Sequence, residues 1–237
     1  MTIVCTEGLG VRLSLGRRLT VVLVLFAGTV ALAVWAVVGF LLPTPPTVDF
    51  SSGHTPGTPV NLTVQTVGTI GFGAHPTWVS YLVRNQNGQW IHSTLWSLPA
   101  HTRINLTIDQ YDSGSPLRNQ QWGLVRGTAG NVEILNGKPI PLYDSNSGNG
   151  VGHTFSIPTL GVNVPLVGIS SDAKNPCSEA PCTPNFDHNV IKVSFVTPSA
   201  GEYPWQCFVP CGLGFLYGNG GPMSTVGYMG GFLDVVA

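Results

Sequence analysis

Charge is scarce in this sequence. Ten Lys and Arg and 11 Asp and Glu occur among 237 residues, so 9% of the chain is charged, against about 25% in an average soluble domain. Coiled coils, long helical bundles and acidic disordered chains need many more charges, so these classes are excluded. The formal net charge is −1 and Lys and Arg form no extended cluster. This argues against a nucleic-acid-binding protein, because phosphate neutralisation requires a basic face.

Charge is absent altogether from residues 19–42, which are mostly Val, Leu and Ala. A helix of that length, rising about 1.5 Å per residue, crosses a hydrocarbon core of roughly 30 Å. Arg12, Arg17 and Arg18 precede this run. By the positive-inside rule, we expect a cytoplasmic N-terminus and a single pass through the cell membrane, with the rest of the chain outside. A cleaved signal peptide is the alternative, but its apolar region usually has about 7–15 residues, so an anchor that stays in the lipid bilayer is favoured.

The sequence is therefore expected to divide into four segments. Residues 1–18 would form a cytoplasmic N-terminus and residues 19–42 a transmembrane anchor. Residues 43–59, which begin with the stiff run Pro43-Thr-Pro-Pro, would form a stem. Residues 60–237 would form one exported domain, because this length suits a single well-buried core.

Helical periodicity is missing after residue 45. Short runs rich in β-branched and aromatic residues are instead separated by Gly, Pro, Asn and Ser, which indicates strands. The expected strands are Val60–Val67, Trp78–Arg84, Arg103–Asp109, Gly152–Ile157, Asn189–Thr197, Tyr203–Cys207 and Phe232–Val236. Such a pattern is typical of an antiparallel sandwich or barrel, so the prediction is an all-β domain. The stretch from Asp112 to Ser147 is expected to form long loops with at most a hairpin, and Asp109 and Asp112 are interpreted as turn residues.

Four of the five cysteines follow the expected anchor, whereas Cys5 precedes it. In an oxidising compartment two disulfides are the default. Cys177 and Cys182 lie in one short loop rich in Pro and Asn, and we expect a local disulfide between them.

Cys207 and Cys211 have a different context, because they follow an expected strand and precede a Gly-rich loop with Met223 and Met229. Thiolates and thioethers held between two strands make a soft-ligand site that suits copper. A disulfide beside core methionines is the alternative. His153 begins another expected strand. The histidines at 54, 75, 92 and 101 are interpreted as structural.

His153, the two cysteines and Met229, taken in this order, resemble the cupredoxin family, and most of all the copper-binding domain of cytochrome c oxidase subunit II. The resemblance lies in His153-Thr-Phe-Ser-Ile-Pro-Thr-Leu-Gly-Val162 and in the run from Gly201 through Cys207-x-x-x-Cys211 to Gly231, and it covers roughly residues 100–237. It implies a Greek-key cupredoxin β-sandwich or barrel behind one transmembrane helix. It also implies copper as the cofactor.

The implied copper ligands are His153, Cys207, Cys211 and Met229, with the Val209 carbonyl and Met223 as weaker contacts. The sequence departs from the family at two ligands. Met229 lies farther beyond the second Cys than the family's Met does. The family has a second His after the second Cys, where Phe215 stands here, and no His follows His188. His188 has no counterpart among the family's ligands.

Three functions are compatible with these residues. The favoured one is one-electron transfer at copper, in a subunit II-like component of a respiratory terminal oxidase or a stand-alone membrane-anchored copper protein. Its expected partners are the lipid bilayer, a haem-copper oxidase subunit I and a redox protein as donor; the chain itself would carry no catalytic centre. Cu(I) storage or delivery is the second function, without a thioredoxin fold because five glycines in the ten residues after Cys211 oppose a helix. The third is a metal-free structural subunit with an oxidised Cys207–Cys211 pair.

Overall fold

A computed structural model of the chain describes residues 14–38, 44–68, 70–71, 75–211 and 221–237. The chain divides into two compact units, residues 1–43 and residues 44–237. The first unit contains one helix, and the second contains all of the strands within the described residues.

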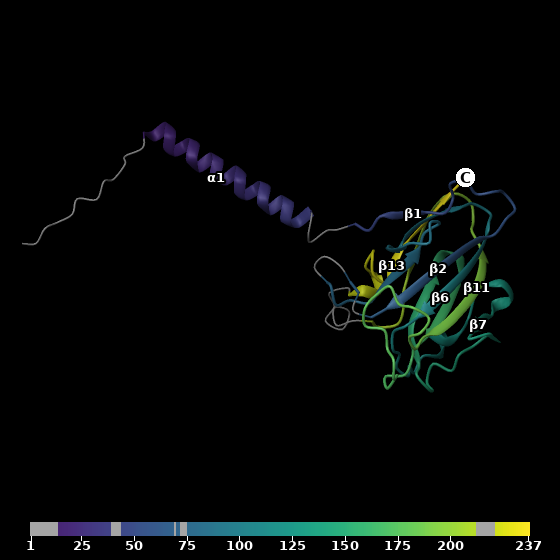
Figure 1. The fold of residues 1–237 in the computed structure, drawn as a ribbon. Helices are drawn as coiled ribbons and strands as arrows, with labels where there is room; N and C mark the ends of the chain where they lie inside the picture. Colours follow the sequence, from purple (N-terminus) through teal and green to yellow (C-terminus); the bar gives the residue numbers. More distant parts are fainter. Residues whose placement is uncertain (1–13, 39–43, 69, 72–74, 212–220) are drawn as a thin grey trace, which may run out of the picture. The chain divides into compact units, whose positions relative to one another are not determined.

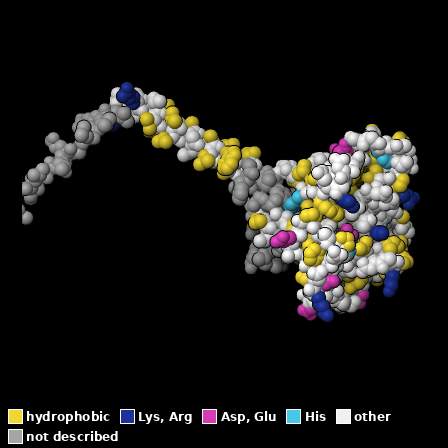
Figure 2. Space-filling view, in the orientation of Figure 1, with side chains coloured by type: hydrophobic (Ala, Val, Ile, Leu, Met, Phe, Trp, Pro, Cys, Tyr) yellow, Lys and Arg dark blue, Asp and Glu magenta, His cyan; other side chains and the backbone are white. Residues whose placement is uncertain are grey.

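The helix of the first unit, α1, comprises Leu15–Ala36 and has no buried residue. Figure 2 shows hydrophobic side chains along α1 and basic side chains at its N-terminal end. The hydroxyl of Thr29 donates a hydrogen bond to the Leu25 carbonyl at 3.0 Å, so this polar group is satisfied within the helix, as a hydrocarbon environment requires. The helix is long enough and apolar enough to span a membrane.

The start of α1 differs from the expected span. The helix begins four residues before residue 19 and includes Arg17 and Arg18, because arginine is a good helix former and marks the edge of the apolar run without ending the helix. Residues 39–42 of the expected span lie outside the described residues.

The second unit contains two mixed sheets, with thirteen strands among the described residues (Figure 1). The six-stranded sheet has the order β1-β5-β13-β12-β9-β10, and the seven-stranded sheet has the order β4-β3-β2-β6-β11-β7-β8. The strands are β1 (Thr47–Asp49), β2 (Val60–Val67), β3 (Ser80–Arg84), β4 (Trp90–His92), β5 (Leu95–Pro99), β6 (Arg103–Gln110), β7 (Glu133–Leu135), β8 (Lys138–Ile140), β9 (Val151–Ile157), β10 (Val162–Val167), β11 (Asn189–Val196), β12 (Gly201–Gln206) and β13 (Gly230–Val236). Short 3-10 helices are η2 (Gln120–Gly123), η3 (Ala129–Asn131), η4 (Pro158–Leu160) and η5 (Pro222–Ser224).

The two sheets share one hydrophobic core. On β6, Ile104, Leu106 and Ile108 are buried while Asn105 and Thr107 are partly exposed, so the expected alternation is confirmed. Apolar residues from β5, β9, β12 and β13 of the six-stranded sheet belong to the same buried cluster. The mostly-β domain is therefore built as two sheets around a common core, which is the layering of a β-sandwich.

All seven expected strands are present, with ends shifted by up to two residues. The expected hairpin between Asp112 and Ser147 is the pair β7–β8. The strands that the sequence analysis missed are β1, β4, β5 and β10.

The expected stem at residues 43–59 is the main correction to the domain boundaries. Its residues Thr47–Asp49 form β1, which pairs in parallel with β5. Val48 and Phe50 are buried in the shared core. Two apolar side chains two residues apart face the same side of an extended chain, so the Pro-rich segment joins the sheet, and the domain begins before residue 60.

Candidate metal centre

Three neighbouring strands position the candidate ligands. In the six-stranded sheet, β12 lies between β13 and β9. His153 is on β9, Cys207 directly follows β12, and Met229 directly precedes β13. The register pairs Gln206 of β12 with Ser156 of β9 and with Gly230 of β13. Residues separated by more than 50 positions in the sequence therefore meet at one end of these strands.

His153, Cys207 and Cys211 form a compact group of donor atoms. One ligand atom from each residue lies within 4.8 Å of the others, and Nδ1 of His153 is 3.9 Å from Sγ of Cys207. Two ligands bound to one tetrahedral ion at about 2.0–2.3 Å are about 3.6 Å apart. All three side chains are buried. The group therefore has the donor chemistry and the spacing to hold a metal ion.

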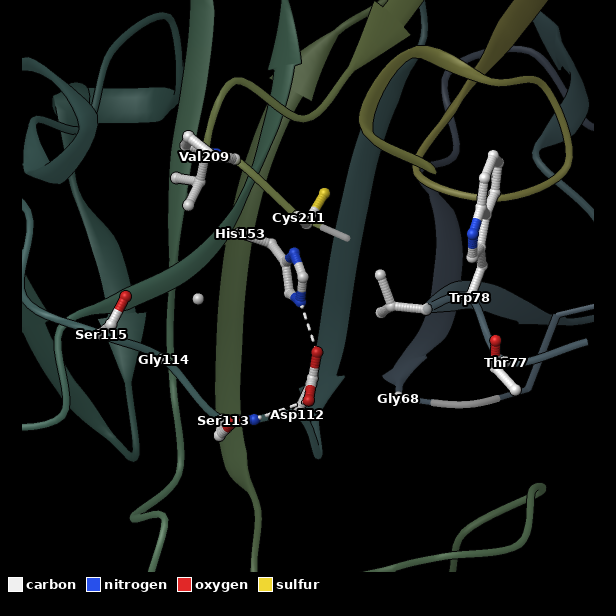
Figure 3. A pocket seen from close by; sticks show the side chains of 13 residues that line it. Gly68, Thr77, Trp78, Asp112, Ser113, Gly114, Ser115, His153, Val209 and Cys211 are labelled. Carbon is white, nitrogen blue, oxygen red and sulfur yellow. Dashed lines mark hydrogen bonds and ion pairs between the residues drawn. The ribbon is translucent and has the colours of Figure 1, made fainter. Parts of the chain in front are cut away.

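Asp112 orients the imidazole of His153. Its Oδ2 accepts a hydrogen bond from Nε2 of His153 at 2.9 Å, and its Oδ1 accepts one from the Ser113 N–H at 2.8 Å (Figure 3). With Nε2 donating to a carboxylate, Nδ1 is the nitrogen left to face Cys207. Metal-binding histidines commonly use this arrangement, which fixes the ring and its tautomer.

The Asp112 segment reaches His153 because glycines leave room for it. A Cβ atom at Gly152 would lie 2.5 Å from the Ser113 carbonyl oxygen, and one at Gly114 would lie 2.6 Å from the Asn149 carbonyl oxygen. Any larger residue would push the two backbones apart. The interpretation of Asp112 as a turn residue is thus incomplete, and the sequence held no signal for the contact because 41 residues separate Asp112 from His153.

Backbone groups surround the Cys207 sulfur. The Thr154 N–H donates to Sγ at 3.4 Å, and the Val209 carbonyl oxygen lies 3.3 Å from the same sulfur. The Phe208 N–H donates to the Thr154 hydroxyl at 2.9 Å, which ties the start of the cysteine loop to β9. The sulfur is therefore held by backbone atoms whose positions the sheet determines.

The cluster perturbs the acidity of its own groups. Burial raises the pKa of Cys207, but hydrogen bonds from Cys211 and His153 outweigh burial and hold this pKa well below its usual value. The hydrogen bond to Cys207, together with burial, raises the pKa of Cys211. Burial lowers the pKa of His153, but hydrogen bonds to Asp112 and Cys207 raise it overall to about 9. Without metal, the cluster thus favours a Cys207 thiolate beside an imidazolium and a Cys211 thiol.

Both methionines contact the cluster through their backbones. The Cys207 N–H donates to the Met229 carbonyl at 2.9 Å and to the Met223 carbonyl at 3.2 Å. Met229 is fully buried in the same apolar cluster as Cys207 and Cys211, and Met223 packs against that cluster. Phe215, at the position of the family's second His, lies outside the described residues. His188 stacks on Tyr111 with ring centroids 4.8 Å apart and is not part of the donor group.

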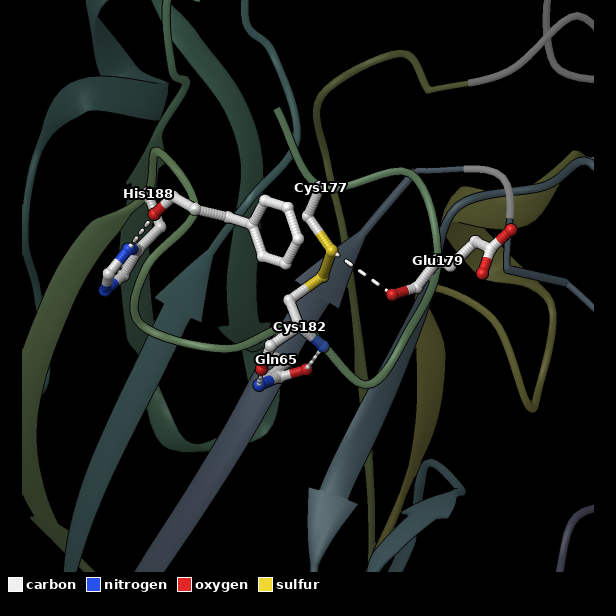
Figure 4. Close-up of a disulfide and its surroundings, with 6 residues drawn as sticks. Gln65, Cys177, Glu179, Cys182 and His188 are labelled. Atoms are coloured by element: carbon white, nitrogen blue, oxygen red, sulfur yellow. Dashed lines mark hydrogen bonds between the residues drawn. A yellow bond between two sulfur atoms is a disulfide. The ribbon is translucent and has the colours of Figure 1, made fainter. Parts of the chain in front are cut away.

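Two further cysteines form a structural cross-link. Cys177 and Cys182 are joined in a disulfide with a Cα–Cα distance of 6.0 Å, whereas Cys207 and Cys211 are free thiols. The side chain of Gln65 makes two hydrogen bonds to the backbone of Cys182, which attach the disulfide loop to β2 (Figure 4).

No protein-family model matches the chain, and no curated protein matches it. The site is therefore defined by its own geometry. It is a buried His/Cys/Cys cluster, oriented by an aspartate, at one end of three neighbouring strands of a two-sheet domain.

Proposed function

We propose that this protein is a membrane-anchored copper-binding electron-transfer protein whose domain has the Greek-key topology of a cupredoxin. The observation that carries the proposal is the convergence of His153, Cys207 and Cys211 within 4.8 Å. The resemblance to the copper-binding domain of cytochrome c oxidase subunit II supports it, because the same three residues are the strongest of the ligands implied there.

The donor set favours copper over harder metals. Thiolates are soft ligands that select Cu(I) and Zn(II), and imidazole suits copper and zinc. His153 would bind through Nδ1 and the two cysteines through Sγ, with the Val209 carbonyl and the Met229 thioether as weaker ligands. Copper, when bound, supplies reversible one-electron oxidation and reduction.

The surrounding residues support that use of the metal. Asp112 holds the imidazole of His153 in one orientation, and the Thr154 N–H donates to the Cys207 sulfur. The donor side chains are buried, which limits their contact with water. Strands and hydrogen bonds hold such a ligand set in nearly the same geometry in both oxidation states of the metal. The groups around the ligands also tune the redox potential of a metal site.

The anchor and the partners follow from the same proposal. With α1 in the membrane and its arginines on the cytoplasmic side, the domain would lie outside the cell membrane. A haem-copper oxidase subunit I would be the electron acceptor and a redox protein the donor. The chain is then an electron-entry component without a catalytic centre of its own.

Copper content and spectroscopy test this function. Full-length protein purified from membranes should contain copper, and the Cu(II) form should show intense visible thiolate-to-copper bands together with an EPR signal. His153→Gln should abolish or greatly shift these bands, whereas the control His188→Gln should leave them unchanged. Protein that binds no copper and gives no such bands would refute the proposal.

Cu(I) storage or delivery is the second candidate, and the three-donor cluster with two adjacent free thiols favours it. The two functions differ in redox behaviour. An electron-transfer site should cycle reversibly between oxidised and reduced forms without losing copper, whereas a delivery site should release Cu(I) to an acceptor and form no stable Cu(II) complex. A metal-free structural subunit would show neither property.

A further inference from the structure

A cavity of about 470 Å³ adjoins the candidate metal centre. Its wall includes His153 and Cys211 from the donor cluster, together with Asp112, Trp78 and Val209 (Figure 3). Because a water molecule occupies about 30 Å³ in the liquid, the cavity has room for a molecule much larger than water. The cavity reaches two of the three donors, His153 and Cys211.

The donor cluster has three strong donors, so a fourth strong donor can take the place of a weak ligand such as Val209 or Met229. Cu and Zn sites with thiolate and imidazole ligands are commonly four-coordinate, whereas the described residues bring three strong donors together. Since His153 and Cys211 belong both to the cluster and to the cavity wall, a donor atom inside the cavity can reach the same metal ion.

The polarity of the cavity selects the kind of ligand. Among the described residues that line it, Asp112 is the only charged side chain outside the donor cluster, and none of them is Lys or Arg. A carboxylate in a partly enclosed space repels anions and accepts hydrogen bonds from N–H groups. Hydroxyl groups of Thr77, Ser113 and Ser115 and the ring of Trp78 supply further polar and apolar contacts.

We propose that this cavity is a binding site for a neutral imidazole-type nitrogen donor, which completes the coordination of a metal ion held by His153, Cys207 and Cys211. The inference rests on the proposed copper site. The donor has two chemically equivalent sources, a free small molecule or a histidine side chain presented by a partner polypeptide. In both cases the bound nitrogen donor takes the place of the histidine that the chain lacks after Cys211.

The test is a ligand titration of the copper-loaded full-length protein, followed by visible absorption and EPR. Imidazole should shift the thiolate-to-copper bands and the copper hyperfine splitting in a saturable manner. Azide, an anionic donor of similar size, should bind at least about tenfold more weakly. A blocked Gly-His-Gly peptide distinguishes the sources: saturable binding by the peptide indicates that a partner's histidine fits, and binding by imidazole alone assigns a small molecule.

A cavity-filling variant localises the binding. Thr77→Trp should weaken imidazole binding by about tenfold or more, whereas Thr183→Trp, at an exposed threonine that does not line the cavity, should bind imidazole like the native protein. Copper-loaded native protein whose spectra do not respond to imidazole, or which prefers azide, overturns this inference and leaves the copper site intact. Protein that takes up no copper overturns the proposed function and this inference with it.

Discussion

Asp112 and His153 are joined by a hydrogen bond of 2.9 Å between Oδ2 and Nε2, although the two residues are 41 positions apart in the sequence. This contact connects the segment after β6, a strand of the seven-stranded sheet, to β9 of the six-stranded sheet. It directs Nδ1 of His153 toward the sulfur of Cys207. The imidazole of His153 thus lies between a partly exposed carboxylate and a buried pair of cysteines. A residue that does not belong to the donor cluster, Asp112, therefore positions one of its three members.

Removing the charge of Asp112 should weaken metal binding. Asp112→Asn leaves a side chain of similar size that no longer fixes the imidazole tautomer, and the loss of such a partner typically lowers metal affinity by about 10–100-fold. Asp109→Asn is the matched control, because the charges that act on Asp109 are those of His188 and Lys192 and not those of the donor cluster. Copper affinity measured by competition with a chelator provides the comparison. Equal affinities for the two variants would show that Asp112 does not position His153.

The disulfide should stabilise the domain without affecting the metal centre. Cys177 and Cys182 close a loop with a sequence separation of 5, for which loop-closure entropy predicts a contribution of about 2 kcal/mol. Replacing both cysteines by serine should lower the free energy of unfolding in urea by about this amount. Copper content and spectrum should not change. A loss of copper in this double variant would place the disulfide loop in the site.

Stability should fall as the pH rises, because of one buried carboxyl group. Neither oxygen of Glu133 has a hydrogen-bond partner within the described residues, and burial raises its pKa from 4.5 to about 8. Between these values the folded state keeps a proton that the unfolded state releases. The free energy of unfolding should therefore decrease with increasing pH, by at most about 1.4 kcal/mol per pH unit.

Glu133→Gln tests this dependence, because glutamine does not titrate. The variant should gain stability over the native protein progressively from pH 5 to pH 8, and the difference should level off above pH 8. Glu202→Gln, at an exposed position, serves as the control and should follow the native curve. Urea denaturation at several pH values gives the answer, and parallel curves for all three proteins would contradict the assignment.

The shared core predicts a sharp contrast between adjacent residues of β6. Ile108 is fully buried between the sheets, so Ile108→Ala should cost about 2–5 kcal/mol of unfolding free energy. Thr107 faces the opposite side of the strand and is partly exposed, so Thr107→Ala should change stability by no more than about 0.5 kcal/mol. Similar effects of the two substitutions would mean that the two sheets do not pack through this face.

The strands were predictable where their residues alternate. In β6 and β11 polar and apolar side chains occupy opposite faces, and this period of two is visible in the sequence alone. Strands such as β1 and β5 were missed because their pairing is parallel to distant partners and their segments are only three to five residues long. Such short runs carry little periodicity.

The site was predictable only in part. The positions of His153, Cys207 and Cys211 suggested a cluster because they resemble a family pattern, and the structure brings their donor atoms together. Asp112 was not predicted as part of the site, since its contact with His153 depends on the close approach of two backbones at Gly152. No sequence periodicity reports an approach of that kind.

The most direct measurement is the copper content per chain, combined with the visible and EPR spectra, of native full-length protein and of Cys207→Ser. Cys207 lies at the centre of the cluster, within reach of His153, Val209 and Cys211. If the protein is a copper electron-transfer protein, the native form contains copper and shows intense thiolate-to-copper absorption, and Cys207→Ser loses both. Native protein purified from membranes without copper, with Cys207 and Cys211 oxidised to a disulfide, would contradict the proposed function.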